Sequence, residues 1–242
     1  RNMTKTIEAI FIDLGNTLRS LVKDEEHMRR ARTEMVRLVG TDEDPLAFVE
    51  KLTERYKGYR KWAFENLAEA PEADLWTRWL VPDFPRERIV TLGAELTYLF
   101  RQSMGRRVVV EGGREVLEEL GRRGYTLGII SNLIGTREIP EWLEQEDYAR
   151  YFKSVVLSSV LGIRKPSPEI FYEAARRAGV KPEACAYVGD NLKRDVTGTR
   201  AAGFGMVVIM MPVEELAEAV ITDENRPDEI IHNFRKLLDI FP

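Results

Sequence analysis

The chain has 242 residues, which is enough for one sizeable hydrophobic core together with an inserted segment. Its 40 acidic and 36 basic residues give a formal net charge of −4, and no basic cluster typical of nucleic-acid binding stands out. The single cysteine, Cys185, excludes an internal disulfide and a cluster of thiolate metal ligands, and no apolar run is long enough to cross a membrane. We therefore expect a cytoplasmic protein that binds neither nucleic acid nor a membrane, with Cys185 buried and unreactive.

The first apolar run, Ala9–Ile12, predicts a short buried strand. It ends in the carboxylate of Asp13, and a turn of small residues that contains Gly15 and Thr17 follows. Ligands of open α/β sheets bind beyond the carboxyl ends of the strands. Asp13 therefore occupies the place of a nucleophile or a metal ligand.

The next stretch, of about a hundred residues, is far longer than an ordinary connection between a strand and a helix. It carries apolar residues at helical spacing and shows no strand pattern. Glycine or proline lies near most ends of the helical segments. We expect an inserted cap of four helices, at 24–39, Pro45–Asn66, 73–80 and 86–104.

Four further apolar runs predict buried strands, with helical patterns between most of them. Two of these helices, 112–123 and Pro168–Ala178, are each followed by a glycine that suits a left-handed cap. The alternation predicts an α/β fold with a doubly wound parallel sheet. The four strands are expected at 126–130, Ser154–Leu157, 184–188 and 205–210.

These elements divide the chain into two parts. Residues 1–20 and 106–242 are expected to form the α/β core, and residues 21–105 a helical cap over the strand tips. His232 lies in a C-terminal pattern that looks helical, and nothing around it suggests catalysis.

Polar residues follow the other strands at the same edge of the predicted sheet. Ser131 and Asn132 end the second strand, Lys165 follows the third, and Asp190 ends the fourth, with Asp195 five residues later. Carboxylates suit a hard cation, whereas a lysine and a hydroxyl suit phosphate oxygens. Together with the carboxylate of the first strand, this set suits a phosphoryl group bound beside magnesium.

In this order of motifs the chain resembles the haloacid dehalogenase superfamily, in the branch whose helical cap follows the first strand. Asp13 falls on the family's nucleophile, Ser131 on its second motif and Lys165 on its third. Asp190 and Asp195 fall on its fourth. The resemblance extends over nearly the whole chain and implies a Rossmann-like core and a hydrolase.

The resemblance implies a magnesium-dependent phosphatase of a small phosphorylated substrate. Asp13 would attack phosphorus and form an aspartyl-phosphate, which water would then hydrolyse. Magnesium would be held by the side chains of Asp13 and Asp190 and by the backbone carbonyl of Gly15.

The other motif residues have supporting roles in the same resemblance. Ser131, the amide of Asn132 and Lys165 would hold the phosphate and supply positive potential. Asp195 would act through water or by orienting Lys165, and Thr17 would orient the turn after the nucleophile.

Gly15 departs from the pattern, because most phosphatases of this superfamily have there an aspartate that protonates the leaving oxygen. General acid–base catalysis contributes ~10²–10⁴-fold. Its loss should matter most for esters with poor leaving groups, and least for acyl, aryl and anomeric sugar phosphates. Glycine keeps the backbone carbonyl, so the metal site can survive.

Two other hypotheses stay open. In a 2-haloacid dehalogenase, Asp13 would attack carbon without a metal, and Gly15 permits this. Asp190 argues against it, because a second carboxylate beside Asp13 would repel it without a cation. The third hypothesis is a non-enzymatic binding module, which retention of Asp13, Lys165 and Asp190 disfavours.

The cap should select the substrate, but its sequence does not identify one. Arg60 and Lys61 lie among aromatic residues and could meet an anionic group, although an amphipathic helix that packs its aromatics is the commoner interpretation. His27 could replace the missing proton donor, although a surface helix residue is the commoner interpretation. The sequence gives no indication of the oligomeric state.

Overall fold

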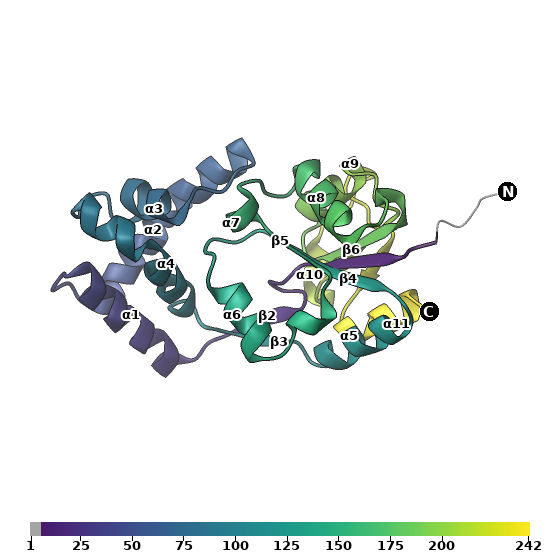
Figure 1. The fold of residues 1–242 in the computed structure, drawn as a ribbon, viewed down its shortest axis with the longest axis horizontal. Helices are drawn as coiled ribbons and strands as arrows, with labels where there is room; N and C mark the ends of the chain where they lie inside the picture. The colour runs from purple at the N-terminus through teal and green to yellow at the C-terminus, as the bar shows by residue number, and fades with distance from the viewer. Residues whose placement is uncertain (1–5) are drawn as a thin grey trace.

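The computed structural model describes residues 6–242, so residues 1–5 of the expected core segment lie outside the described part. Its main sheet has six parallel strands in the order β5-β4-β1-β6-β7-β8. Figure 1 shows helices on both sides of this sheet, which confirms the predicted doubly wound α/β fold. The strands are β1 Ala9–Ile12, β4 Thr126–Ser131, β5 Ser154–Leu157, β6 Cys185–Gly189, β7 Met206–Met210 and β8 Glu229–Ile231. Strand β8 is one that the sequence analysis did not predict.

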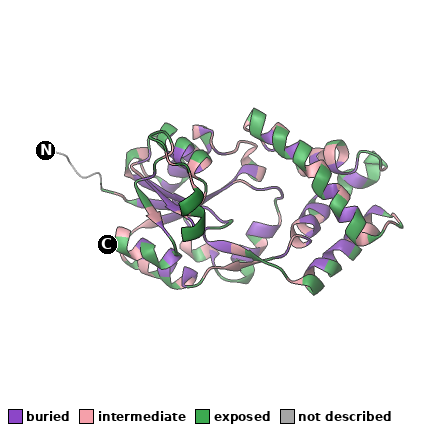
Figure 2. Ribbon diagram, turned by 180° about the vertical axis from the view of Figure 1, so that it is seen from behind, coloured by how far each residue is buried: buried purple, intermediate pink, exposed green. Residues whose placement is uncertain are grey.

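Strand β1 lies inside the sheet and is buried on both faces. Ile10 and Ile12 pack in the apolar cluster that contains α5 (Gly113–Arg122) and α11 (Leu237–Ile240). Ala9 and Phe11 pack in the cluster of α8 (Pro168–Ala178) on the opposite face. Figure 2 shows the strands of this sheet mostly in the colour of buried residues. Burial on both faces is why the strands read as continuous apolar runs rather than alternating ones.

The helix α8 has the limits that its sequence predicts. Ser167 caps its first turn, since the Ser167 hydroxyl accepts a hydrogen bond from the amide of Glu169. Gly179 ends the helix with φ = 71°, a left-handed conformation that glycine adopts without steric strain. The remaining short helices of the core are α6 Glu138–Gln145, α7 Ser158–Leu161, α9 Leu192–Ala201 and α10 Val213–Glu218, with 3₁₀ turns at Ala149–Tyr151, Pro182–Ala184 and Phe234–Lys236.

The helical segment between β2 and β3 has an apolar cluster of its own, and Figure 1 shows it at one end of the molecule. The third predicted helix is a short α-helix that continues as a wider π-helical turn over Leu75–Leu80. The buried centre of the cluster includes Phe48, Leu52, Tyr59, Trp76, Leu96 and Phe100. The helices are α1 Glu25–Val39, α2 Pro45–Asn66, α3 Glu72–Asp74 and α4 Arg86–Gln102.

A two-stranded antiparallel ribbon joins the helical segment to the sheet. It pairs β2 (Arg19–Val22) with β3 (Arg106–Val109). The expectation that no strand lies between the first and second core strands is therefore wrong. Both strands are four residues long and only partly buried, so neither forms the apolar run by which the core strands were recognised. The division into core and cap stays a prediction, and we propose this ribbon as the junction.

Two further features concern Cys185 and His232. Cys185 lies at the start of β6, and its predicted burial is confirmed. Burial raises the pKa of its thiol to about 12, which disfavours the reactive thiolate. The predicted helix around His232 is wrong, because this residue directly follows β8. None of the helices in residues 6–242 combines the length and the hydropathy of a membrane span.

Candidate active site

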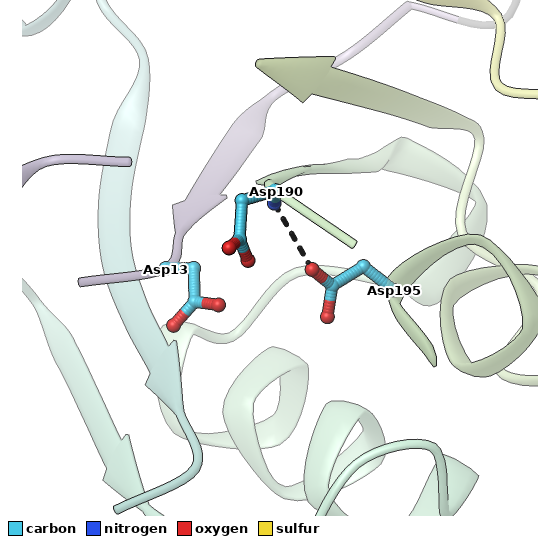
Figure 3. A group of neighbouring side chains, drawn as sticks. All are labelled: Asp13, Asp190 and Asp195. Carbon is cyan, nitrogen blue, oxygen red and sulfur yellow. Dashed lines mark hydrogen bonds between the residues drawn. The ribbon is translucent and has the colours of Figure 1, made fainter. Parts of the chain in front are cut away.

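The pairing of β1 with β6 brings two carboxylates to one edge of the sheet. The strands are parallel and in register, with Ile12 opposite Val188. The amide of Asp13 donates to the carbonyl of Val188 at 2.9 Å, and Asp190 follows β6 by one residue. Figure 3 shows the side chains of Asp13 and Asp190 at these neighbouring strand tips. The predicted convergence of strand tips therefore occurs at this edge.

Asp195 completes a group of three carboxylates and supports the turn after β6. One oxygen from each of Asp13, Asp190 and Asp195 lies within 4.8 Å of the others. Asp195 Oδ2 accepts hydrogen bonds from the amides of Asp190 (3.1 Å, the dashed line in Figure 3) and Asn191 (3.0 Å). Burial would raise the pKa of Asp195, but the charges of Lys165 and Arg194 hold it well below its usual value.

The buried side chain of Lys165 contacts the carboxylates of both Asp13 and Asp195. Its ammonium lies 2.8 Å from Asp13 Oδ2 and 3.0 Å from Asp195 Oδ1, and it donates to the hydroxyl of Tyr187 at 2.5 Å. The side chain of Asn132 fixes the backbone of this lysine, since its Nδ2 donates to the Lys165 carbonyl at 3.0 Å and its Oδ1 accepts from the Lys165 amide at 2.8 Å. Burial raises the pKa of Tyr187 well above its usual value, so its hydroxyl stays protonated.

Two predicted hydroxyl residues lie at the same edge. Ser131 is the last residue of β4 and is buried, and its hydroxyl has no hydrogen bond recorded within residues 6–242. Thr17 is fully buried, and its Oγ1 has no hydrogen-bond partner in that part of the chain. Ser131 is thus available to donate to a ligand, whereas the Thr17 hydroxyl has no hydrogen bond within residues 6–242 that would orient the turn.

Gly15 presents its backbone and leaves room for a side chain. The recorded hydrogen bonds of the turn use the carbonyls of Asp13 and Leu14, and none within residues 6–242 uses that of Gly15. A Cβ atom added to Gly15 would meet no atom within 4 Å, and its backbone is not in the left-handed region. Within residues 6–242, the Gly15 carbonyl therefore accepts no recorded hydrogen bond and is available to a ligand. The Cβ atom of an aspartate at this position would fit.

Arg194 is a member of the site that sequence reasoning missed. From the first turn of α9, its Nη2 donates to Asp190 Oδ1 at 3.0 Å and to Asp13 Oδ2 at 3.4 Å. The same atom lies 3.2 Å from Asp195 Oδ2, and Nε donates to Asp195 Oδ1 at 2.9 Å. No clear signal in the sequence indicates this contact, because Asp190 precedes the N-cap of α9 and the rule for residues four apart applies within a helix.

The residues present fit a divalent cation. Among residues 6–242, the recorded cationic partners of the three carboxylates are one ammonium and one guanidinium, so negative charge remains uncompensated. Burial and the charges of Asp13 and Asp195 raise the pKa of Asp190 to about 6, even with Arg194 beside it. Carboxylates and a backbone carbonyl are the oxygen ligands that hard cations prefer. Both oxygens of Asp195 already have several donors, which favours Asp13, Asp190 and Gly15 as the ligands.

A cavity of about 280 Å³ reaches Asp190 from outside. Its lining includes Asn16, whose side chain donates to Asp190 Oδ2 at 3.2 Å, and His232. The Nδ1 of His232 bonds to the carbonyl of Met211 at 2.9 Å. Of the three carboxylates, Asp190 is the one that lines this cavity.

The cap residues considered in the sequence analysis do not join this site. His27 Nε2 pairs with Gln102 Oε1 at 2.8 Å within the helical segment. Arg60 and Lys61 are exposed on α2, and Lys61 lies 3.9 Å from Glu65 of the same helix. The neighbouring Tyr59 is buried in the helical cluster, as an amphipathic packing helix requires.

Known proteins that are similar to this chain include hydrolases and phosphatases. A family model described as a haloacid dehalogenase-like hydrolase matches residues 7–203. The chain is 28% identical to the glyceraldehyde 3-phosphate phosphatase of Pyrococcus furiosus, over 98% of this chain and 93% of that protein. It is 38% identical to the protein of the same name from Methanopyrus kandleri over 51% of this chain, and the match spans about half of that relative (52%).

Two solved structures have the same fold. A 2-haloacid dehalogenase from Pseudomonas syringae pv. Tomato DC3000 has a TM-score of 0.70 at 24% identity, covering 97% of this chain and 98% of that one. An HAD phosphatase from Thermococcus onnurineus has a TM-score of 0.58 at 22% identity, covering 97% of each chain. At this level of identity the structural similarity establishes the fold alone, and the reaction has to be inferred from the residues of the site.

Proposed function

Because the chain belongs to the haloacid dehalogenase-like hydrolase family, we propose that it is a magnesium-dependent phosphatase of small phosphomonoesters. The observation that carries the proposal is Asp13 Oδ2, which lies 2.8 Å from the buried ammonium of Lys165 and within a group of three carboxylates. A nucleophilic carboxylate needs such positive charge to approach an anionic ester. The relatives named glyceraldehyde 3-phosphate phosphatase support a phosphorylated substrate.

In the proposed reaction, Asp13 attacks phosphorus and the ester oxygen leaves, which gives an aspartyl-phosphate that water hydrolyses. Lys165 holds a phosphate oxygen and stays oriented by Asp195 and Tyr187. The Ser131 hydroxyl and the amide of Asn132 hold the other oxygens. The side chain of Asn132 is engaged by the backbone of Lys165, so only its backbone is available to substrate.

The carboxylates of Asp13 and Asp190 and the carbonyl of Gly15 would hold the magnesium ion. When bound, it would neutralise charge on the transferring phosphoryl group. Asp195 would keep its hydrogen bond to the amide of Asp190 and so stabilise the turn that carries this ligand.

The rate of the proposed reaction should depend on the leaving group of the substrate. Gly15 supplies no proton to the departing oxygen, so we propose substrates with stabilised leaving groups, such as acyl, aryl or anomeric sugar phosphates. Glyceraldehyde 3-phosphate, in the names of two relatives, has an ordinary alkoxide leaving group. With that ester the proton would have to come from water.

A 2-haloacid dehalogenase is the second candidate, and Arg194 favours it. The repulsion between Asp13 and Asp190 was the argument against this reaction, and the guanidinium that contacts both relieves it without a metal. The hypothesis of a non-enzymatic binding module has lost support, because the family is one of hydrolases.

The deciding experiment is a screen of phosphate esters with excess magnesium or excess chelator, with 2-chloropropionate in parallel. We expect phosphate release that requires magnesium and no chloride release. The Asp13→Asn variant, whose side chain has nearly the same size, is the control and should be inactive. Chloride release, or equal phosphate release in chelator, would overturn the proposal.

A further inference from the structure

The side chain of Arg194 lies among the carboxylates that would hold the metal. One atom, Nη2, lies within 3.4 Å of oxygens from Asp13, Asp190 and Asp195. Among these oxygens are Asp13 Oδ2 and Asp190 Oδ1, which belong to both side chains proposed as metal ligands. A divalent cation and a guanidinium on the same two carboxylates would repel each other, so they compete for this place.

Arg194 can leave this place more easily than the other cation of the site. The side chain of Arg194 is 28% exposed, whereas that of Lys165 is fully buried. Lys165 is also held through its backbone by Asn132 and through its ammonium by Tyr187. Within residues 6–242, the recorded hydrogen bonds and ion pairs of the Arg194 side chain are those to the three carboxylates, so rotation of this side chain toward solvent breaks no other recorded polar contact.

The rest of the site keeps its support when the guanidinium moves away. The amide of Arg194 donates to the side chain of Asn191 at 2.7 Å, which fixes its backbone in the first turn of α9. Asp195 retains Lys165 and the amides of Asp190 and Asn191 as partners. Movement can therefore be confined to one side chain, and Asp190 stays in place.

We propose that Arg194 is a resident counter-ion that holds the carboxylates of Asp13 and Asp190 together until a divalent cation displaces it. This inference rests on the proposed function, because it concerns the same magnesium site. A magnesium ion can bind only when it displaces the guanidinium from the carboxylates of Asp13 and Asp190. Arg194 therefore lowers the affinity for magnesium and stabilises the metal-free protein.

The test is magnesium binding measured by titration calorimetry in the absence of substrate, so that catalysis plays no part. We expect Arg194→Gln to bind magnesium about tenfold more tightly than the parent, which is within the usual range of coupling between two ligands. The matched control is Lys193→Ala, which removes a charge from an exposed neighbour on the same helix. Its affinity should stay close to that of the parent, because the exposed Lys193 has no recorded contact with the three carboxylates within residues 6–242.

A second measurement covers the possibility that Arg194→Gln folds poorly. The conservative variant Arg194→Lys keeps the charge but cannot contact several carboxylates at once, and it should bind magnesium more tightly than the parent. In crystals of the parent protein grown with magnesium, the guanidinium should have left Asp13 and Asp190. In crystals grown with chelator it should contact both.

The outcomes separate this inference from the proposed function. Equal magnesium affinity in the parent, Arg194→Gln and Arg194→Lys would overturn the exchange and leave the phosphatase intact. A magnesium ion bound while the guanidinium still contacts both carboxylates would do the same. Absence of magnesium binding in every protein would overturn the inference together with the proposed metal dependence.

Discussion

The buried Glu69 forms an ion pair with the partly buried Arg164, with Glu69 Oε1 2.9 Å from Arg164 Nη1, between the helical segment and the loop that carries Lys165. Ser158 donates to the same oxygen at 3.0 Å, and the hydroxyl of Tyr59 donates to the other. The backbones are also joined, since the amide of Glu69 donates to the carbonyl of Gly162 at 3.0 Å. The position of the helical segment is therefore coupled to the loop of the proposed phosphate-binding lysine.

Glu69→Ala should destabilise the protein strongly, because it removes the carboxylate that accepts from the partly buried guanidinium of Arg164 and from the buried hydroxyl of Tyr59. Removal of one partner from a buried pair typically lowers the free energy of unfolding by about 3 kcal/mol or more. The control is Glu65→Ala, which removes an exposed ion pair with Lys61 and should change stability by less than about 0.5 kcal/mol. Urea denaturation checks both, and a similar small change in the two variants would contradict the coupling.

Gly15→Asp should restore the missing proton donor, since a Cβ there meets no atom within 4 Å. We expect kcat for alkyl phosphate esters to rise about tenfold or more, with little change for aryl esters. The matched control is Gly15→Asn, which has the same size and cannot donate an acidic proton. Magnesium affinity should stay that of the parent, because the proposed ligand is the backbone carbonyl. A large loss of affinity would rule out that ligand.

Tyr187→Phe should weaken the support of Lys165 without removing its charge. The buried ammonium loses one partner, and the carbonyl of Ile130 loses the hydroxyl that donates to it at 3.0 Å. The free energy of unfolding should fall by about 1–3 kcal/mol, and kcat should fall with it. Tyr172→Phe is the control, because its exposed hydroxyl makes only a 3.4 Å contact with Ala201. Equal effects of the two substitutions on kcat would argue against a role for Tyr187 in positioning the lysine.

Glu138 should make stability depend on pH in the acid range. Burial would raise its pKa, but Arg101, Arg107 and Arg19 lower it from 4.5 to about 2. A carboxyl whose pKa is depressed in the folded state stabilises the protein above its unfolded pKa. This stabilisation, about 3 kcal/mol by linkage, is lost as pH falls from about 4.5 to about 2.

The measurement for Glu138 is urea denaturation of the parent and Glu138→Gln at pH 6 and at pH 2.5. The variant should be clearly less stable at pH 6, and the difference should shrink at pH 2.5. A difference that stays constant between these values would show that Glu138 is not the titrating group.

The sequence by itself was enough to predict the parallel sheet and its polar strand tips. Short buried strands such as Ala9–Ile12 are local apolar runs, and parallel pairing brings their carboxyl ends to one edge. Asp13, Lys165 and Asp190 could therefore be placed together before any contact was known. Gly15 could be recognised as unusual because the family that the chain resembles usually has an aspartate two residues after the nucleophile.

Only the tertiary structure decided the parts that depend on contacts between distant segments. The β2–β3 ribbon pairs Arg19 with Val109, and such pairing leaves no local apolar pattern in strands that are partly exposed. Arg194 in sequence is one charged residue of a helix among many, and its role follows from where its guanidinium reaches. The charge balance around Asp13, and with it the competition for a metal, is a property of these distances and cannot be read from residue order.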